Sequence, residues 1–138
     1  MGNKKILIVD DDPDIRHGMH VRLKANDYDT FFAADAFSSV VEARKHRPDV
    51  IILDLGLPAG DGFLVMERLA KIPFLAVIPV IVVSARDGLG NQKRALDAGA
   101  KAFLQKPVDD VELLTVIRRV LGEPTQPEKA TLQAQGSV

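Results

Sequence analysis

Two patterns of hydrophobic and polar positions alternate along the chain. Short apolar runs recur in "KKILIVD", "YDTFFAA", "DVIILD", "IPVIVVSA" and "KAFLQ" (residues 4–10, 28–34, 49–54, 78–85 and 101–105). Apolar runs without polar alternation are typical of strands that are buried on both faces of a sheet. The sequence therefore predicts five buried strands, of which the second is the weakest.

Helical periodicity fills the intervals between these runs. The predicted helices lie within residues 12–26, 35–46, 60–71, 91–100 and 109–121. The first follows Asp12 and Pro13, an N-cap followed by a proline in the first turn. In the second helix, we expect Phe37, Val40 and Val41 to point inward.

Five strand and helix units in this order predict an α/β fold, a single parallel sheet with helices on both faces. The predicted domain spans residues 1–121. Residues 122–138, "GEPTQPEKATLQAQGSV", are polar, include two prolines and lack periodicity. They are expected to form a flexible tail or a truncated linker, since 17 residues are too few for an effector domain.

Composition excludes several classes of function. The chain has 46% hydrophobic residues, a net charge of −1 and no cysteine, which excludes disulfides, thiol catalysis and cysteine-bound metals. The near-neutral charge disfavours direct binding to nucleic acid or to an anionic membrane. No apolar stretch approaches the about 20 residues of a membrane span, so a soluble cytoplasmic protein is expected.

Polar residues follow four of the five strands. Asp10 and Asp11 come after the first, Asp54 ends the third, Ser84 ends the fourth and Lys106 follows the fifth. The carboxyl ends of such strands open onto one crevice. Clustered carboxylates need a cation, and oxygen ligands favour Mg²⁺. A lysine and a hydroxyl beside the metal suggest a phosphoryl ligand, with Asp54 as its nucleophile.

The chain resembles the receiver domain of two-component response regulators. Four strings carry the resemblance, "ILIVDDDPDIR", "IILDLGLPAGDG", "VIVVSA" and "FLQKP", and they stand in the family's order and spacing across residues 4–121. The resemblance implies a flavodoxin-like, doubly wound sheet of five strands in the order 2-1-3-4-5 with five helices.

The resemblance also implies the metal and phosphoryl sites. Asp54 would accept a phosphoryl group from a phosphohistidine. Asp10 and Asp11 would bind Mg²⁺ together with a carboxylate oxygen of Asp54 and the backbone carbonyl of Gly56. Because Gly56 is small, we expect it to shield the phosphoryl group little from water.

Further roles are implied for residues near the fourth and fifth strands. The Ser84 hydroxyl and the Lys106 ammonium would bind phosphoryl oxygens, and the bond from Lys106 to Pro107 is expected to be cis. Phe103 would be the switch aromatic that turns inward. Arg86 lies at a position that modulates hydrolysis in this family.

The implied function is a regulatory switch that catalyses only its own phosphorylation and dephosphorylation. The phosphodonor would be a sensor histidine kinase or a histidine phosphotransfer protein. The phosphoryl group would change the surface of the fourth helix, fifth strand and fifth helix. The sequence leaves the downstream target, homodimerisation and the phosphoryl lifetime open.

Three alternatives belong to other classes. A receiver-like binding module that signals without phosphorylation keeps the same pattern. A phosphohydrolase with an aspartyl nucleophile requires a second acid where Gly56 stands. A flavodoxin-type electron carrier requires a phosphate-binding loop after the first strand, where "DDDPD" would repel phosphate.

Overall fold

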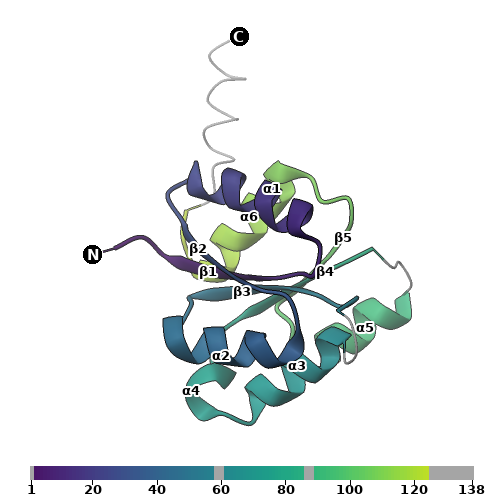
Figure 1. Cartoon of the computed structure of the whole chain (residues 1–138). Coiled ribbons are helices and arrows are strands. Elements are labelled where there is room, and N and C mark those ends of the chain that lie inside the picture. The colour runs from purple at the N-terminus through teal and green to yellow at the C-terminus, as the bar shows by residue number, and fades with distance from the viewer. Residues whose placement is uncertain (1, 58–60, 86–88, 125–138) are drawn as a thin grey trace.

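The chain folds around one parallel sheet, as a computed structural model of residues 2–57, 61–85 and 89–124 describes it. The strands are β1 (Lys5–Val9), β2 (Asp29–Ala33), β3 (Val50–Asp54), β4 (Val80–Ser84) and β5 (Ala102–Gln105). Their order is β2-β1-β3-β4-β5, and every pairing is parallel. The predicted fold class, strand number and strand order are confirmed (Figure 1).

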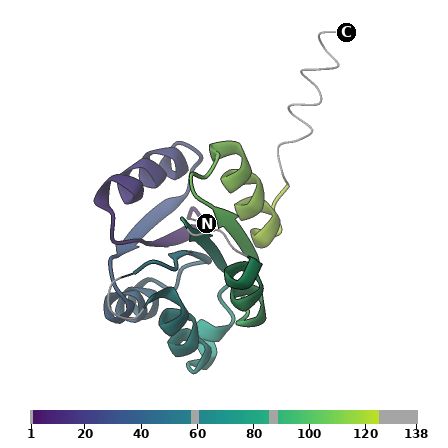
Figure 2. The ribbon, with the colours of Figure 1, turned by 90° about the vertical axis from the view of Figure 1, so that its right-hand side faces the viewer.

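Helices cover both faces of the sheet. They are α1 (Pro13–Lys24), α2 (Ala36–His46), α3 (Asp61–Ala70), α4 (Pro73–Ala76), α5 (Leu89–Asp97) and α6 (Asp110–Leu121). Figures 1 and 2 show α1 and α6 on one face and α2, α3 and α5 on the other. Each face has its own buried apolar cluster, and β3 and β4 are buried along their full length. None of the helices within these described residues is long and apolar enough to cross a membrane.

The helix α4 was not predicted. It has four residues, begins with Pro73 at its first position and lies in the connection between α3 and β4. A single turn is too short to show a helical period in the sequence. The described chain therefore has one helix more than predicted, and the fourth and fifth predicted helices are α5 and α6.

Aspartate side chains cap three of the helices at their expected starts. The Asp12 carboxylate accepts a hydrogen bond from the Asp14 N–H at 2.9 Å, and that of Asp35 accepts one from the Ser38 N–H at 2.7 Å. Asp109 caps α6 in the same way. These bonds satisfy N–H groups that have no partner within the helix.

The predicted inner face of α2 was wrong for two residues. Phe37 is 74% exposed and Val41 is 42% exposed, while Ala36 and Ala43 are buried. Ser39 is also buried, and its hydroxyl donates to the Asp35 carbonyl at 2.6 Å. Small residues spaced three and four apart define the face toward the sheet, so the larger side chains lie to one side of it.

Two predicted features lie outside the described residues. Arg86 is one, and residues 125–138 of the expected tail are the other. The described chain ends just after Gly122, which closes α6 in the left-handed conformation with φ of 74°.

Two glycines in helices are expected to have opposite effects on stability when each is replaced by alanine. A Cβ on Gly62 would lie 2.7 Å from the Asp54 carbonyl oxygen and 2.9 Å from Leu55 Cα, whereas a Cβ on Gly18 would meet nothing within 4 Å. We expect Gly62→Ala to destabilise the fold by about 1–3 kcal/mol, because backbone atoms must move. Gly18→Ala should stabilise it by about 0.5–1 kcal/mol through helix propensity.

Urea unfolding of the two variants and the wild type measures both effects. Gly18→Ala is the matched control, because it makes the same change in a helix without the close approach. Equal unfolding free energies for the two variants would contradict the role of close packing at Gly62.

Candidate functional site

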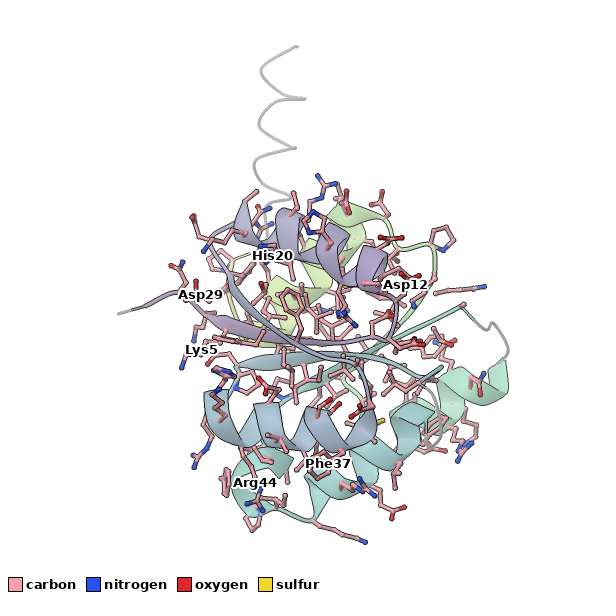
Figure 3. The ribbon with its side chains drawn as sticks, in the orientation of Figure 1. Lys5, Asp12, His20, Asp29, Phe37 and Arg44 are labelled. Atoms are coloured by element: carbon pink, nitrogen blue, oxygen red, sulfur yellow. The ribbon has the colours of Figure 1, made fainter. Side chains whose placement is uncertain are left out.

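Three carboxylates meet at the carboxyl ends of β1 and β3. Asp10 follows β1 and is 3% exposed, Asp54 ends β3 and is 7% exposed, and Asp11 is exposed. One oxygen of each lies within 4.8 Å of the others. Asp12, labelled in Figure 3, lies at this end of the sheet where α1 begins. The parallel sheet thus brings together the acids that the sequence places at two strand ends.

Lys106 supplies the positive charge for this cluster. Its Nζ lies 2.8 Å from Asp10 Oδ2 and 3.5 Å from Asp54 Oδ2. Burial alone would lower the pKa of Lys106, but the hydrogen bond to Asp10 and the charges of both carboxylates outweigh it and raise the pKa. The peptide bond between Lys106 and Pro107 is cis, as expected. The site therefore holds a charged ammonium group between two buried acids.

Burial and the neighbouring groups together shift the pKa of Asp54. Loss of solvent is the largest cause that raises the pKa of Asp54, and the nearby Asp10 carboxylate raises it further. The Gly56 N–H, which donates to Asp54 Oδ1 at 3.0 Å, and the Lys106 charge act in the opposite direction. The net shift is upward, so additional positive charge at this carboxylate would stabilise its ionised form.

Ser84 and Lys106 share one corner of the site. Ser84 ends β4, is 1% exposed and pairs in register with Gln105 of β5. The Lys106 backbone N–H donates to the Ser84 carbonyl at 2.8 Å. This bond fixes the start of the loop after β5 against the end of β4.

Gly56 and Phe103 have different relations to Asp54. A Cβ on Gly56 would lie 3.5 Å and 3.6 Å from the two Asp54 carboxylate oxygens, so a side chain there would cover Asp54. Phe103 is partly buried against the core in β5 and lines a hollow of about 470 Å³ with residues of α5 and α6. Phe103 therefore lies within the predicted switch surface, which α5, β5 and α6 form.

The donor atoms fit a hard divalent cation. They are carboxylate oxygens, with the backbone carbonyl of Gly56 close by in sequence. Mg²⁺ binds oxygen at about 2.0–2.1 Å, so opposite ligands lie about 4.2 Å apart. One oxygen of each of Asp10, Asp11 and Asp54 lies within 4.8 Å of the others, so the three carboxylates could share one cation if their side chains moved closer together. Because Asp11 is exposed, such an ion could also keep water ligands.

Sequence reasoning missed one residue that builds the site. The Arg16 guanidinium donates from Nη1 to the Asp10 carbonyl at 2.7 Å. The Asp12 N–H donates to Asp10 Oδ1 at 2.9 Å. Arg16 ends the string "DDPDIR" in the first turns of α1, but a single arginine at that distance carries no signal of its own.

An apolar hollow opens beside Lys106. It has a volume of about 490 Å³ and lies between α1 and the loop after β5. Ile15 and Met19 of α1 face Val108 and Leu113 across it. A larger hollow of about 800 Å³, around Tyr28 and Arg118, lies at the opposite ends of the strands and has no part in this site.

Comparison with known proteins agrees with this geometry. Residues 6–118 match the family described as the response regulator receiver domain. Response regulator PleD of Caulobacter vibrioides is 37% identical over 114 residues, which is 83% of this chain and 25% of PleD. Protein PilH of Pseudomonas aeruginosa is 33% identical over 117 residues, which is 85% of this chain and 97% of PilH.

Solved structures agree as well. The receiver domain of the sensor histidine kinase PA1611 of Pseudomonas aeruginosa, which has a magnesium ion in its active-site cleft, matches with a TM-score of 0.81. It is 27% identical, and the match covers 88% of this chain and all of that one. The chain spans between a quarter and about half of the first curated relatives that it matches.

The raised pKa of Asp54 predicts a pH-dependent stability. Between the ordinary pKa of 3.8 and the raised one, the folded state keeps a proton that the unfolded state has released. Stability therefore falls as the pH rises through this window and stays lower above it. Without Mg²⁺ at pH 7, we expect Asp54→Asn to be more stable than the wild type, because the substitution removes a buried charge.

Thermal unfolding between pH 3 and pH 7 tests this expectation. The difference between variant and wild type should vanish at the acid end of the range, and Mg²⁺ should stabilise the wild type more than Asp54→Asn. Asp97→Asn, at an exposed helical site, is the control and should change stability little at any pH. A less stable Asp54→Asn at pH 7 would contradict the pKa direction.

Proposed function

Because the chain belongs to the response regulator receiver family, we propose that Asp54 accepts a phosphoryl group from a phosphohistidine. One observation carries the proposal. The nearly buried Asp54 lies beside Asp10 and Asp11 and within 3.5 Å of the Lys106 ammonium. This is the charge arrangement that an incoming phosphoryl group requires.

The transfer is a substitution at phosphorus. An Asp54 carboxylate oxygen forms the new P–O bond, and the P–N bond to the donor imidazole breaks with its electron pair remaining on nitrogen. The Lys106 ammonium pairs with one phosphoryl oxygen, and the Ser84 hydroxyl donates to another. Both groups start from rigid strand ends, so most of the catalysis is positioning and charge neutralisation.

Mg²⁺ is the proposed cofactor. Asp10, Asp11, one Asp54 oxygen and the Gly56 carbonyl would hold it, and it would supply positive charge to the phosphoryl oxygens. The oxygen-only donor set supports this assignment. The magnesium ion in the PA1611 receiver domain, a structural neighbour of this chain, supports it too.

The proposed switch acts by changing a binding surface and does not release a product. Receiver domains interact with histidine kinases or with phosphotransfer proteins, and we assign this chain's phosphodonor to one of these classes. The apolar hollow beside Lys106 offers the donor a contact next to Asp54. Movement of the Ser84 hydroxyl toward the phosphoryl group, with inward rotation of Phe103, would alter the surface of α5, β5 and α6.

Incubation with acetyl phosphate and Mg²⁺, followed by intact mass measurement, tests the phosphoacceptor. We expect one phosphoryl adduct on the wild type, none on Asp54→Ala, and none after chelation of the metal. Asp97→Ala, at an exposed aspartate of α5, should be modified like the wild type. A folded wild type without any adduct would instead favour a binding module that signals without phosphate.

A second prediction concerns the lifetime of the acyl phosphate. A side chain at position 56 would begin with a Cβ atom 3.5–3.6 Å from the two carboxylate oxygens of Asp54. Gly56→Asn should therefore hinder the attacking water and slow dephosphorylation by about tenfold. Gly56→Ala is the smaller control and should slow it less. An unchanged rate in Gly56→Asn would show that Gly56 does not set water access.

A further inference from the structure

One side of α2 carries apolar side chains that the fold does not bury. Phe37 is 74% exposed and Val41 is 42% exposed. Together with Arg44 they are spaced four and three residues apart, which places them on one side of the helix. Figure 3 shows Phe37 and Arg44 pointing away from the sheet. Adjacent exposed apolar side chains such as Phe37 and Val41 indicate a binding surface more strongly than scattered apolar residues do.

The short helix α4 extends this side of α2. Phe74 of α4 is 41% exposed, and the Arg47 guanidinium lies 3.9 Å from the centre of its ring. Arg47 also donates from Nε to the Arg44 carbonyl at 3.3 Å. These contacts join the end of α2 to α4. We define the α2–α4 surface as Phe37, Val41, Arg44, Arg47 and Phe74.

The α2–α4 surface is positively charged in a chain whose net charge is −1. Glu42 is the one acidic residue within α2, and its Oε1 lies 3.2 Å from Nε2 of His46. Within residues 2–57, 61–85 and 89–124, no carboxylate forms an ion pair with Arg44 or Arg47. Cations at a helix C-terminus stabilise the helix, which explains part of the charge but not the exposed Phe37.

We propose that the α2–α4 surface docks an acidic amphipathic helix of a partner protein. Apolar side chains three or four residues apart on the partner would pack against Phe37, Val41 and Phe74. Acidic side chains along its edge would pair with Arg44 and Arg47, which supply the charge complementarity. The surface is small, so the contact is a weak one or part of a larger interface.

Two other occupants fit the same surface less well. A two-fold contact between copies of this chain would bring arginines of one copy against those of the other. A membrane would gain from only three apolar side chains, each already partly covered, which is less than stable anchoring requires.

The docking surface involves none of the residues of the phosphorylation site. Figure 1 shows α2 and α4 on the face of the sheet that α3 and α5 also cover, and Asp10, Asp11, Asp54 and Lys106 lie at the carboxyl ends of the strands. The proposal therefore does not rest on the phosphoacceptor role of Asp54. Phosphorylation by acetyl phosphate should be unchanged by substitutions at the α2–α4 surface.

Titration of the ¹⁵N-labelled full chain with two designed peptides tests the proposal. One is a helical peptide with leucines at helical spacing and glutamates beside them, and the other has lysines in place of the glutamates. We expect the acidic peptide to shift the backbone amide signals of α2 and α4. Phe37→Ser and Arg44→Glu should each weaken binding by about tenfold or more. Val111→Ser, at a 71% exposed valine of α6, is the matched control and should bind like the wild type.

The other outcomes would overturn the proposal. Equal binding of the lysine peptide, or no binding of either peptide, would remove the charge argument. Binding to phosphatidylglycerol vesicles that Phe37→Ser abolishes, without peptide binding, would assign the surface to a membrane. Concentration-dependent dimerisation that Phe37→Ser abolishes would assign it to a second copy of the chain. Thermal unfolding of each variant checks that the fold is retained.

Discussion

The contact on which the site depends is the ion pair between the Lys106 ammonium and the two buried acids Asp10 and Asp54. Two carboxylates at neighbouring strand ends repel each other, and burial makes their charges more costly. Buried ion pairs of this kind contribute little net stability. The arrangement is therefore better understood as a preorganised cluster that lacks positive charge than as a stabilising device. Lys106 holds the two carboxylates close together, and because burial raises the pKa of Asp54, its ionised form needs further positive charge.

Most of the fold could be predicted because each step depended on local signals. Uninterrupted apolar runs identified the strands, and Asp12, Asp35 and Asp109 identified three helix starts. The carboxyl ends of parallel strands must meet at one edge, so residues at those ends could be placed together without knowing any distance. Arg16 was missed because its contact is with the backbone of Asp10, and no side-chain pattern in the sequence encodes a backbone acceptor.

The inner face of α2 could not be read from the sequence because two sets of residues compete for it. Phe37 and Val41 are the more hydrophobic set, yet Ala36 and Ala43 face the sheet. On the side toward β2, the His46 ring stacks on Phe31 with centroids 3.8 Å apart. A helix held this closely favours small residues beneath it. That distance is a tertiary property, and the periodicity of one helix does not contain it.

Under the proposed function, the arrangement of the sheet also separates the elements that phosphorylation would move from those that it would leave in place. The backbone hydrogen bond from Lys106 to Ser84 joins the proposed phosphoryl site to β4 and β5, and Phe103 lies in β5. In the proposed switch, a shift of the Ser84 hydroxyl would therefore act first on β5 and on the helices α5 and α6 beside it. In contrast, α2 rests on the β1 and β2 side of the sheet. The central strands between them are fully buried and closely packed, so they resist small displacements. A partner on the α2–α4 surface would consequently be held in both phosphorylation states, while one on α5, β5 and α6 would respond to them.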